Sequence, residues 1–279
     1  MREEFWWKVS KTPIDMAYKQ LKLWFDEELA ALLADKLIDI FPSFHIASFI
    51  QDISAQLPPL ELKDRIEVFA DELDKKLGQG YPKNIELLLQ ILGPENEQEI
   101  DMFKRFYWIM PIAKYVEKYG LEYFEQSMRV ITEITKRNTG EYCIRPFLER
   151  YPQETLNIML TWSQSENFHL RRLASEGGRP RLPWASKLQR FIEDPRPLFP
   201  ILDQLKDDPK KYVQKSVANC LNDILKDNYE WGKTLIESWL PAKGKERKWI
   251  IKHALRRLKK SKDAWALEIL TALGAKGIS

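Results

Sequence analysis

Apolar side chains recur every three to four residues along most of the chain. The spacing is clearest in residues 17–41, 61–77, 84–92 and 99–120, where it places the apolar side chains on one face of a helix. Prolines and glycines separate these segments, and no run alternates apolar and polar residues as a strand does. The pattern predicts an all-α protein.

The second half of the chain repeats one helical pattern three times, in residues 168–176, 212–225 and 249–260. Aligned on Arg172, Lys215 and Lys252, the three segments are offset by 43 and 37 residues. Each follows a helix rich in leucine, isoleucine or tryptophan. Paired helices with a period near 40 residues are typical of HEAT or armadillo repeats, because each pair must bury its apolar face against the next pair. We therefore predict a curved solenoid, whose second helices line the concave surface.

Polar side chains recur at every fourth residue of these three segments, which keeps them on one helix face. They are Arg172 and Glu176 in the first segment, Lys215, Asn219 and Asp223 in the second, and Lys252, Arg256 and Lys260 in the third. Cations at this spacing are able to follow a phosphate backbone, although a solvated face is the simpler explanation. Carboxylates among them repel DNA phosphates, so they either form ion pairs or serve chemistry, by holding water or stabilising a developing cation.

Two other segments concentrate charged and aromatic side chains. LRRLASEGGRPRLPWA (170–185) places Trp184 in a loop beyond a Gly-Gly pair, where the indole either stacks on a ligand or packs on its own repeat. TGEYCIRPFLERYP (139–152) places Glu141 one helical turn before Arg145. An acid at this place is also explained by the helix dipole alone.

Charge is unevenly distributed along the chain. Residues 1–100 carry 11 Lys and Arg against 19 Asp and Glu, whereas residues 101–279 carry 33 against 22. A basic second part favours a polyanionic partner such as nucleic acid, unless the imbalance belongs to solvated faces alone.

The remaining composition argues against several classes of protein. Cys143 and Cys220 are far apart and fit neither a zinc site nor a disulfide framework, and the three histidines do not cluster. The sequence has no P-loop and no GxGxxG motif, so nucleotide and nicotinamide chemistry are not expected. Neither a signal-peptide core nor a membrane-spanning apolar run is found. We expect a cytoplasmic protein that uses no metal or other cofactor.

Three segments together resemble the AlkC branch of the AlkC/AlkD alkylpurine DNA glycosylases: TGEYCIRPFL, LRRLASEGGRPRLPWA and VQKSVANCLNDILKDN. The similarity covers roughly residues 29–265, and the SEGGRPRLPWA string is its most specific part. It implies a right-handed, C-shaped solenoid of HEAT-like repeats with a basic concave groove, formed by residues 29–279. Residues 1–28 are then an N-terminal helical extension, and the C-terminal immunoglobulin-like module of some relatives is expected to be absent.

The resemblance also implies an activity. Members of this family remove cationic alkylated bases, notably 3-methyladenine, from duplex DNA, without a metal and without flipping the base into a pocket. The implied partner of this chain is therefore double-stranded alkylated DNA. We expect a monomer that needs neither a membrane nor an obligatory protein partner.

Carried over residue by residue, the resemblance assigns catalytic roles to Glu141, Glu176, Trp184 and Asp223. Position and charge make seven other side chains candidate DNA contacts: Arg145, Arg172, Arg179, Arg181, Lys215, Lys252 and Arg256. Asp223 is expected to stabilise the positive charge that passes to the deoxyribose, and we find no lysine nucleophile for a bifunctional reaction. The alternative is a non-catalytic HEAT-like scaffold that binds DNA or protein.

Overall fold

The protein is described here by a computed structural model, which covers residues 19–100 and 104–274. The described residues form helices and contain no strand, so the all-α prediction is confirmed. The chain divides into two compact units, one of Met1–Gly93 with Trp108–Tyr115 and one of Pro94–Tyr107 with Val116–Ser279. Within the described ranges, no helix has both the length and the apolar character that crossing a membrane requires.

The N-terminal unit is built from short helices packed in sequence order, α2 on α3, α3 on α4 and α4 on α5. Up to Gly93, its elements are η1 (Leu21–Trp24), α2 (Glu27–Ile38), α3 (Ile46–Gln56), α4 (Leu62–Leu77) and α5 (Tyr81–Gln90), and it also includes Trp108–Tyr115. The prediction of one helix over 17–41 is wrong, because α2 begins only after Asp26. The Asp26 carboxylate accepts a hydrogen bond from the Leu29 N–H at 3.2 Å, which caps a new helix at that point.

The predicted division at residue 28 falls in a segment of which only residues 19–28 are described. Residues 1–18 lie outside the described residues, while 19–28 contain η1 and the first residues of α2. The division into 1–28 and 29–279 therefore stays a prediction.

The rest of the chain continues as helices joined by short turns, with one longer loop before α11. These elements are η2 (Tyr107–Ile109), α6 (Met110–Tyr119), α7 (Phe124–Thr135), α8 (Arg145–Arg150), α9 (Pro152–Ser163), α10 (Phe168–Glu176), α11 (Gln189–Glu193), η3 (Arg196–Leu198), α12 (Phe199–Leu205), α13 (Lys211–Asp227), α14 (Tyr229–Ser238), α15 (Lys245–Ala254), α16 (Arg256–Lys260) and α17 (Ala264–Ala272). The predicted helix over 168–176 is confirmed at both ends. The segment 212–225 is confirmed as the body of α13.

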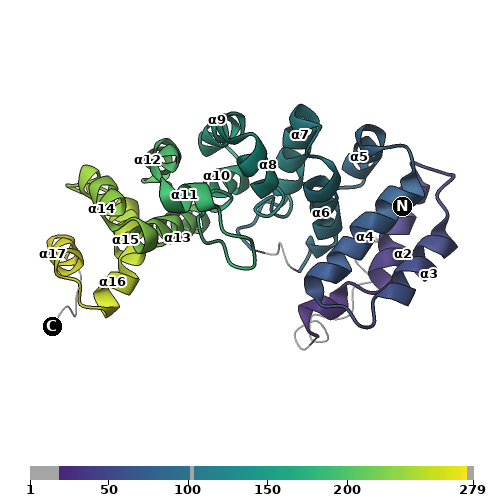
Figure 1. The fold of residues 1–279 in the computed structure, drawn as a ribbon, viewed down its shortest axis with the longest axis horizontal. Coiled ribbons are helices and arrows are strands. Elements are labelled where there is room, and N and C mark those ends of the chain that lie inside the picture. The colour runs from purple at the N-terminus through teal and green to yellow at the C-terminus, as the bar shows by residue number, and fades with distance from the viewer. Residues whose placement is uncertain (1–18, 101–103, 275–279) are drawn as a thin grey trace. The chain divides into compact units, whose positions relative to one another are not determined.

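Helices of the C-terminal unit stack in two rows (Figure 1). One row contains α10, α13 and α15, with α13 packed against both of its neighbours. The other contains α9, α12 and α14, which pack against the first row, α9 on α10, α12 on α13 and α14 on α13. The predicted helix pairs are therefore present, and they stack as HEAT-like repeats do.

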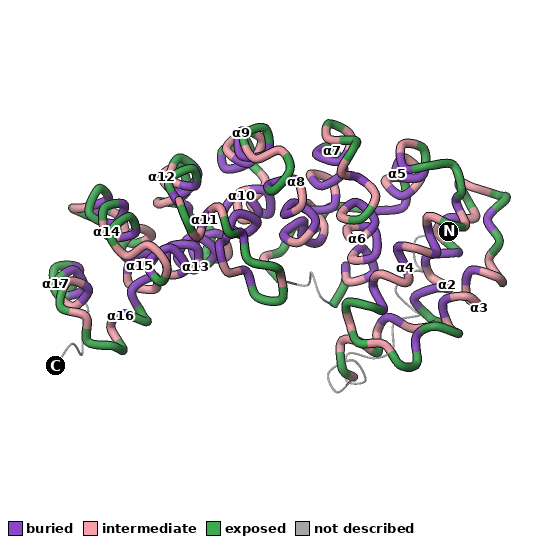
Figure 2. Tube along the Cα trace, in the orientation of Figure 1, coloured by how far each residue is buried: buried purple, intermediate pink, exposed green. Residues whose placement is uncertain are grey.

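The middle helix α13 supplies much of the core of this stack (Figure 2). Val213, Val217, Leu221 and Ile224 recur at helical spacing and are fully buried. Burying side chains of this size stabilises the fold by roughly 1.5–3 kcal/mol each. The same helix carries polar residues to the boundary of the core, which is where Asp223 lies.

The prediction of one helix over 249–260 is wrong. The backbone turns at Leu255, whose ψ of 0° departs from the helical value of about −42°. This turn separates α15 from α16 and leaves Leu255 and Leu258 both buried. Lys252 and Arg256 therefore belong to two successive helices and do not share the face of one.

Candidate active site

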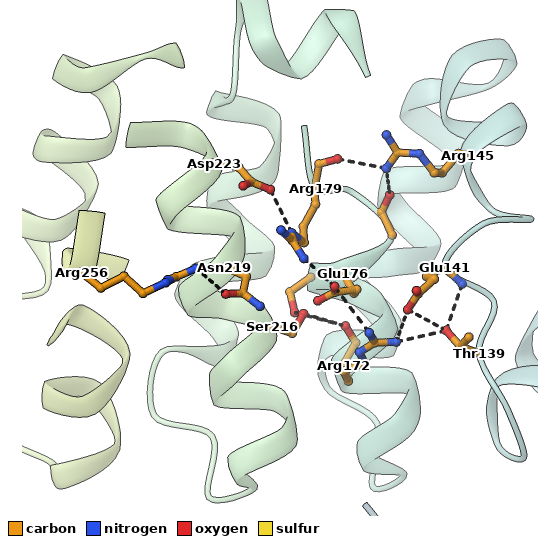
Figure 3. A network of polar contacts seen from close by, with 12 residues as sticks. Thr139, Glu141, Arg145, Arg172, Glu176, Arg179, Ser216, Asn219, Asp223 and Arg256 are labelled. Carbon is orange, nitrogen blue, oxygen red and sulfur yellow. Dashed lines mark hydrogen bonds and ion pairs between the residues drawn. The ribbon is translucent and has the colours of Figure 1, made fainter. Parts of the chain in front are cut away.

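A row of five charged side chains crosses the C-terminal unit and alternates in sign (Figure 3). It consists of Glu141, Arg172, Glu176, Arg179 and Asp223, and we call it the ion-pair chain. Its members come from the turn before α8, from α10, from the loop after α10 and from α13. Helix packing thus brings together groups that lie as much as 44 residues apart within a single ion pair.

Glu141 forms the first end of the ion-pair chain. Its carboxylate pairs with the Arg172 guanidinium and accepts a hydrogen bond from the Thr139 hydroxyl at 3.1 Å. The Thr139 oxygen in turn accepts from Arg172 Nη1 at 3.1 Å and from the Glu141 N–H at 3.2 Å. The first carboxylate is therefore held by the hydroxyl of its own turn and by a cation from α10.

Two glycines allow this turn to lie close to its neighbours. A Cβ added at Gly140 would lie 2.8 Å from both Ile131 Cγ2 and Thr135 Oγ1, which belong to α7. A Cβ at Gly177, at the end of α10, would lie 2.7 Å from Ile144 Cγ2. The absence of side chains at both positions lets the 140–144 turn pack between α7 and α10, so that Glu141 reaches Arg172.

Glu176 lies in the middle of the ion-pair chain, between two guanidiniums. Its Oε1 is 2.7 Å from Arg179 Nη1 and 3.5 Å from Arg172 Nη2. Burial alone would raise the pKa of this carboxyl, but Arg172 and Arg179 outweigh burial and hold the pKa below its ordinary value. The negative charge of Glu176 is thus fixed and already compensated.

Asp223 forms the other end, and its balance is different. The carboxylate accepts from Arg179 Nε at 2.9 Å, and that guanidinium is shared with Glu176. Burial raises the pKa of Asp223 above its ordinary value, since the lowering by Arg179 does not offset it. The charge of Asp223 is therefore less compensated than that of Glu176, and a positive charge beside Asp223 is stabilised more than one beside Glu176.

The loop between α10 and α11 carries Trp184. The indole is 66% exposed, and Trp184 has a φ of 63°, a left-handed backbone conformation that few side chains adopt without strain. Arg181 anchors the loop to α13 through hydrogen bonds to the Asp227 carboxylate, from Nε at 2.7 Å and from Nη2 at 2.6 Å. Leu182, which is buried, anchors the same limb on the apolar side. The exposed aromatic ring therefore stands on a fixed base.

Comparison with known proteins places this geometry in a family. The model of the DNA alkylation repair enzyme family matches residues 112–258, more than half of the chain. The chain belongs to the DNA alkylation repair enzyme family. It is also similar to the structure of the Pseudomonas fluorescens alkylpurine DNA glycosylase AlkC bound to DNA containing an abasic site analog. That match has 36% identity and a TM-score of 0.82, and covers 90% of this chain and 68% of AlkC.

A second relative is the uncharacterized protein YhaZ of Bacillus subtilis (strain 168). It is 35% identical over 250 residues, which cover 89% of this chain and 67% of YhaZ. These matches confirm the resemblance to the AlkC branch and the HEAT-like helical repeat fold of this DNA alkylation repair enzyme. The matches to AlkC and YhaZ cover 90% and 89% of the chain, whereas the family model matches residues 112–258 only.

The structure brings the three predicted catalytic carboxylates of this family member together. Glu141, Glu176 and Asp223 are buried and joined through two arginines. Trp184 lies outside that chain of contacts, in the loop that begins directly after Glu176 and also contains Arg179. Their assignment as catalytic residues stays a prediction.

The seven predicted DNA contacts divide into two groups. Four are buried or paired with a carboxylate: Arg145, Arg172, Arg179 and Arg181. Lys215 and Arg256 are exposed and Lys252 is half-buried. Arg256 donates to the Asn219 side-chain oxygen at 2.9 Å, whereas the two lysines form no ion pair with the described part of the chain. The second group is better placed to meet phosphate.

Sequence reasoning missed several residues that support the site. Thr139 holds Glu141, Asp227 holds Arg181, and Ser175 joins α10 to α13 through a 2.7 Å hydrogen bond with Ser216. The sequence does contain a clue to Asp227, since it lies one helical turn beyond Asp223 and so on the same helix face. No group of three or more potential metal ligands occurs among residues 19–100 and 104–274.

Proposed function

We propose that the chain is a monofunctional alkylpurine DNA glycosylase that hydrolyses the N-glycosidic bond of cationic alkylated bases in duplex DNA, with 3-methyladenine favoured. N-alkylation gives the base a positive charge, so it leaves readily and needs no strong general acid. As the bond breaks, positive charge passes to the deoxyribose, as in glycoside hydrolysis. The protein acts as a monomer, needs no metal, and does not flip the base into a pocket.

One observation carries this proposal: the ion-pair chain ends at a buried carboxylate with incomplete charge compensation. Asp223 pairs with Arg179, and it shares this guanidinium with Glu176. A sugar cation beside Asp223 would therefore add one more positive charge after the last carboxylate of the alternating row. We infer that Asp223 stabilises the sugar and orients water, while Glu176 and Glu141 keep the arginines in place.

The surrounding residues fit a duplex DNA substrate. Lys215, Lys252 and Arg256 offer cations on adjacent helices, as phosphate contacts require. The exposed indole of Trp184 offers an electron-rich face to the sugar and to the cationic nucleotide. Because these contacts reach the backbone and the sugar, the lesion need not leave the base stack.

The proposal is tested by a product assay on methylated duplex DNA. The intact protein is expected to release 3-methyladenine faster than 7-methylguanine, and to leave abasic sites without strand cleavage. Chromatography of the released bases and a gel of the treated strand measure both outcomes. Salt-sensitive binding to DNA with no release of either base contradicts the enzyme and supports the scaffold alternative.

A pH profile tests the state of Asp223. Because the carboxylate is the active form, single-turnover release is expected to fall as pH is lowered through a pKa above the ordinary aspartate value of 3.8. Arg179 lowers the pKa of Asp223, so Arg179→Met is expected to move the acid limb to higher pH. Rates are measured against spontaneous base loss at each pH. Superimposable profiles for the two proteins would exclude this role of Arg179.

A further inference from the structure

Arg145 is a buried cation whose resolved partners are backbone carbonyls. It is the first residue of α8 and only 4% exposed. Its Nη1 donates to the carbonyls of Gly177 and Arg179, both at 3.0 Å, and its Nη2 donates to the carbonyl of Ser186 at 2.6 Å. Burial lowers the pKa of Arg145 to about 10, so the side chain remains charged at neutral pH. This placement suits a role inside the fold more than contact with DNA phosphate.

The three carbonyls belong to one loop, residues 177–188, and lie on both of its limbs. Gly177 and Arg179 are on the outgoing limb, and Ser186 is on the returning one. Between them stands Trp184, exposed and in a left-handed conformation. A single guanidinium therefore closes the base of the loop that presents the indole.

The same contacts also hold the backbone of Arg179, the arginine that pairs with Asp223 at the end of the ion-pair chain. Arg145 holds the carbonyl of Arg179, whose side chain bridges Glu176 and Asp223 (Figure 3). A shift of this backbone would move the cation that neutralises both carboxylates. Arg145 is thus connected to the aromatic and to the acidic part of the site through backbone carbonyls, not through the side chains of Trp184 or Arg179.

Arginine is suited to this task and lysine is not. The planar guanidinium presents several N–H donors in a fixed fork, whereas an ammonium is a compact charge on a flexible stem. Other anchors would keep the loop folded without Arg145: the Arg181 pair with Asp227, and the buried Leu182 and Leu188. Loss of the fork is therefore expected to misplace the loop more than to unfold it.

We propose that Arg145 is a positioning residue for base release, which sets the loop of Trp184 and the backbone of Arg179 and does not bind DNA. This inference rests on the proposed glycosylase function. It differs from the expectation that the sequence gives, in which Arg145 contacts phosphate. Its effect is exerted through Trp184 and Arg179, so it is visible in the rate of the chemical step.

The test is a double-mutant cycle of Arg145→Lys and Trp184→Ala. Arg145→Lys is expected to lower single-turnover release about three- to tenfold at saturating enzyme, with affinity for undamaged duplex unchanged. In the Trp184→Ala background the same change is expected to have a clearly smaller effect, because the indole that Arg145 positions has already been removed. Effects that multiply, or a salt slope of binding reduced by about 1, overturn the proposal.

Arg171→Lys is the matched control. Arg171 also donates to two backbone carbonyls, those of Ser165 and Glu166, and pairs with Asp208, but it holds no part of the Trp184 loop. It is expected to lower thermal stability as Arg145→Lys does and to leave release unchanged. Equal losses of release in the two variants assign Arg145 to general stability and overturn the proposal.

Hydrogen exchange separates this inference from the proposed function. The Leu188 N–H donates to the Pro180 carbonyl at 3.1 Å and closes the loop. Arg145→Lys is expected to speed exchange in a peptide spanning 180–188, and Arg171→Lys is not. Unchanged exchange contradicts the positioning role, whatever the activity. Absence of base release by the unaltered protein contradicts the proposed function instead.

Discussion

Replacing Asp223 by asparagine is expected to slow release of the methylated base at least tenfold, about 1.4 kcal/mol of activation free energy. The amide keeps the shape of the side chain but removes the charge that stabilises the developing sugar cation in the proposed mechanism. The buried position of Asp223 strengthens the effect, because the effective dielectric constant is lower there than in water and the attraction between opposite charges is correspondingly stronger. The measurement is single-turnover release of 3-methyladenine at saturating enzyme, with DNA affinity determined separately.

Asp208→Asn is the matched control for this substitution. Asp208 is also a buried carboxylate of the C-terminal unit and pairs with Arg171 Nε at 2.6 Å, away from the ion-pair chain. It is expected to lower stability without changing release below the melting temperature. If Asp223→Asn releases the base as fast as the unaltered protein does, Asp223 is not the catalytic carboxylate.

The three carboxylates of the ion-pair chain are not expected to be equivalent. Glu176 contacts two guanidiniums, and its pKa is held low, against its burial, by Arg172 and Arg179. Asp223 has a raised pKa, because burial dominates over its one shared partner. Environments that separate the pKa values of neighbouring acids also separate their roles. The charge of Glu176 is therefore compensated by Arg172 and Arg179, whereas the charge of Asp223 is compensated less and is expected to interact with a cationic substrate.

The sequence predicted much of the fold because its helices bury regular apolar stripes. The 3.6-residue period determines which face of a helix meets the core, and the spacing near 40 residues determines that helix pairs stack. Helix ends were harder to predict, since they depend on single local events. Asp26 caps the start of α2, although the apolar spacing of residues 17–41 continues across this position. The turn at Leu255 divides α15 from α16 in the same way.

The acids of the candidate site can be predicted from the sequence, but the groups that pair with them cannot. Acids among cations at helical spacing are visible in a sequence, so Glu176 and Asp223 stood out. Which arginine neutralises which acid is not visible, because the Arg179–Asp223 pair needs α10 and α13 to be packed together. Arg145 was harder still. Its partners are backbone carbonyls, which every residue has and no pattern of side chains reveals.

A second large effect is expected on stability, from Arg172→Met. Arg172 pairs with Glu141 and Glu176, and all three side chains are at least 85% buried. Removing the cation from a buried ion pair leaves uncompensated charge, at a cost of about 3–5 kcal/mol in the free energy of unfolding. Urea denaturation at pH 7 measures this loss. Lys206→Met is the control, because its pair with Asp203 is more exposed and should cost at most about 1 kcal/mol.

The loss caused by Arg172→Met is also expected to depend on pH in a defined direction. In the unaltered protein the lowered pKa of Glu176, held down by Arg172 and Arg179 against burial, contributes stability above the unfolded-state pKa that is lost as pH falls. Without Arg172, the burial of Glu176 is opposed less, so the pKa of Glu176 is higher than in the unaltered protein and the variant loses less stability as this carboxyl is protonated. The difference between the two proteins should therefore shrink between pH 7 and about pH 4. A difference that stays constant over this range, or grows, would show that the Arg172 guanidinium stabilises the fold by packing and not by neutralising Glu141 and Glu176.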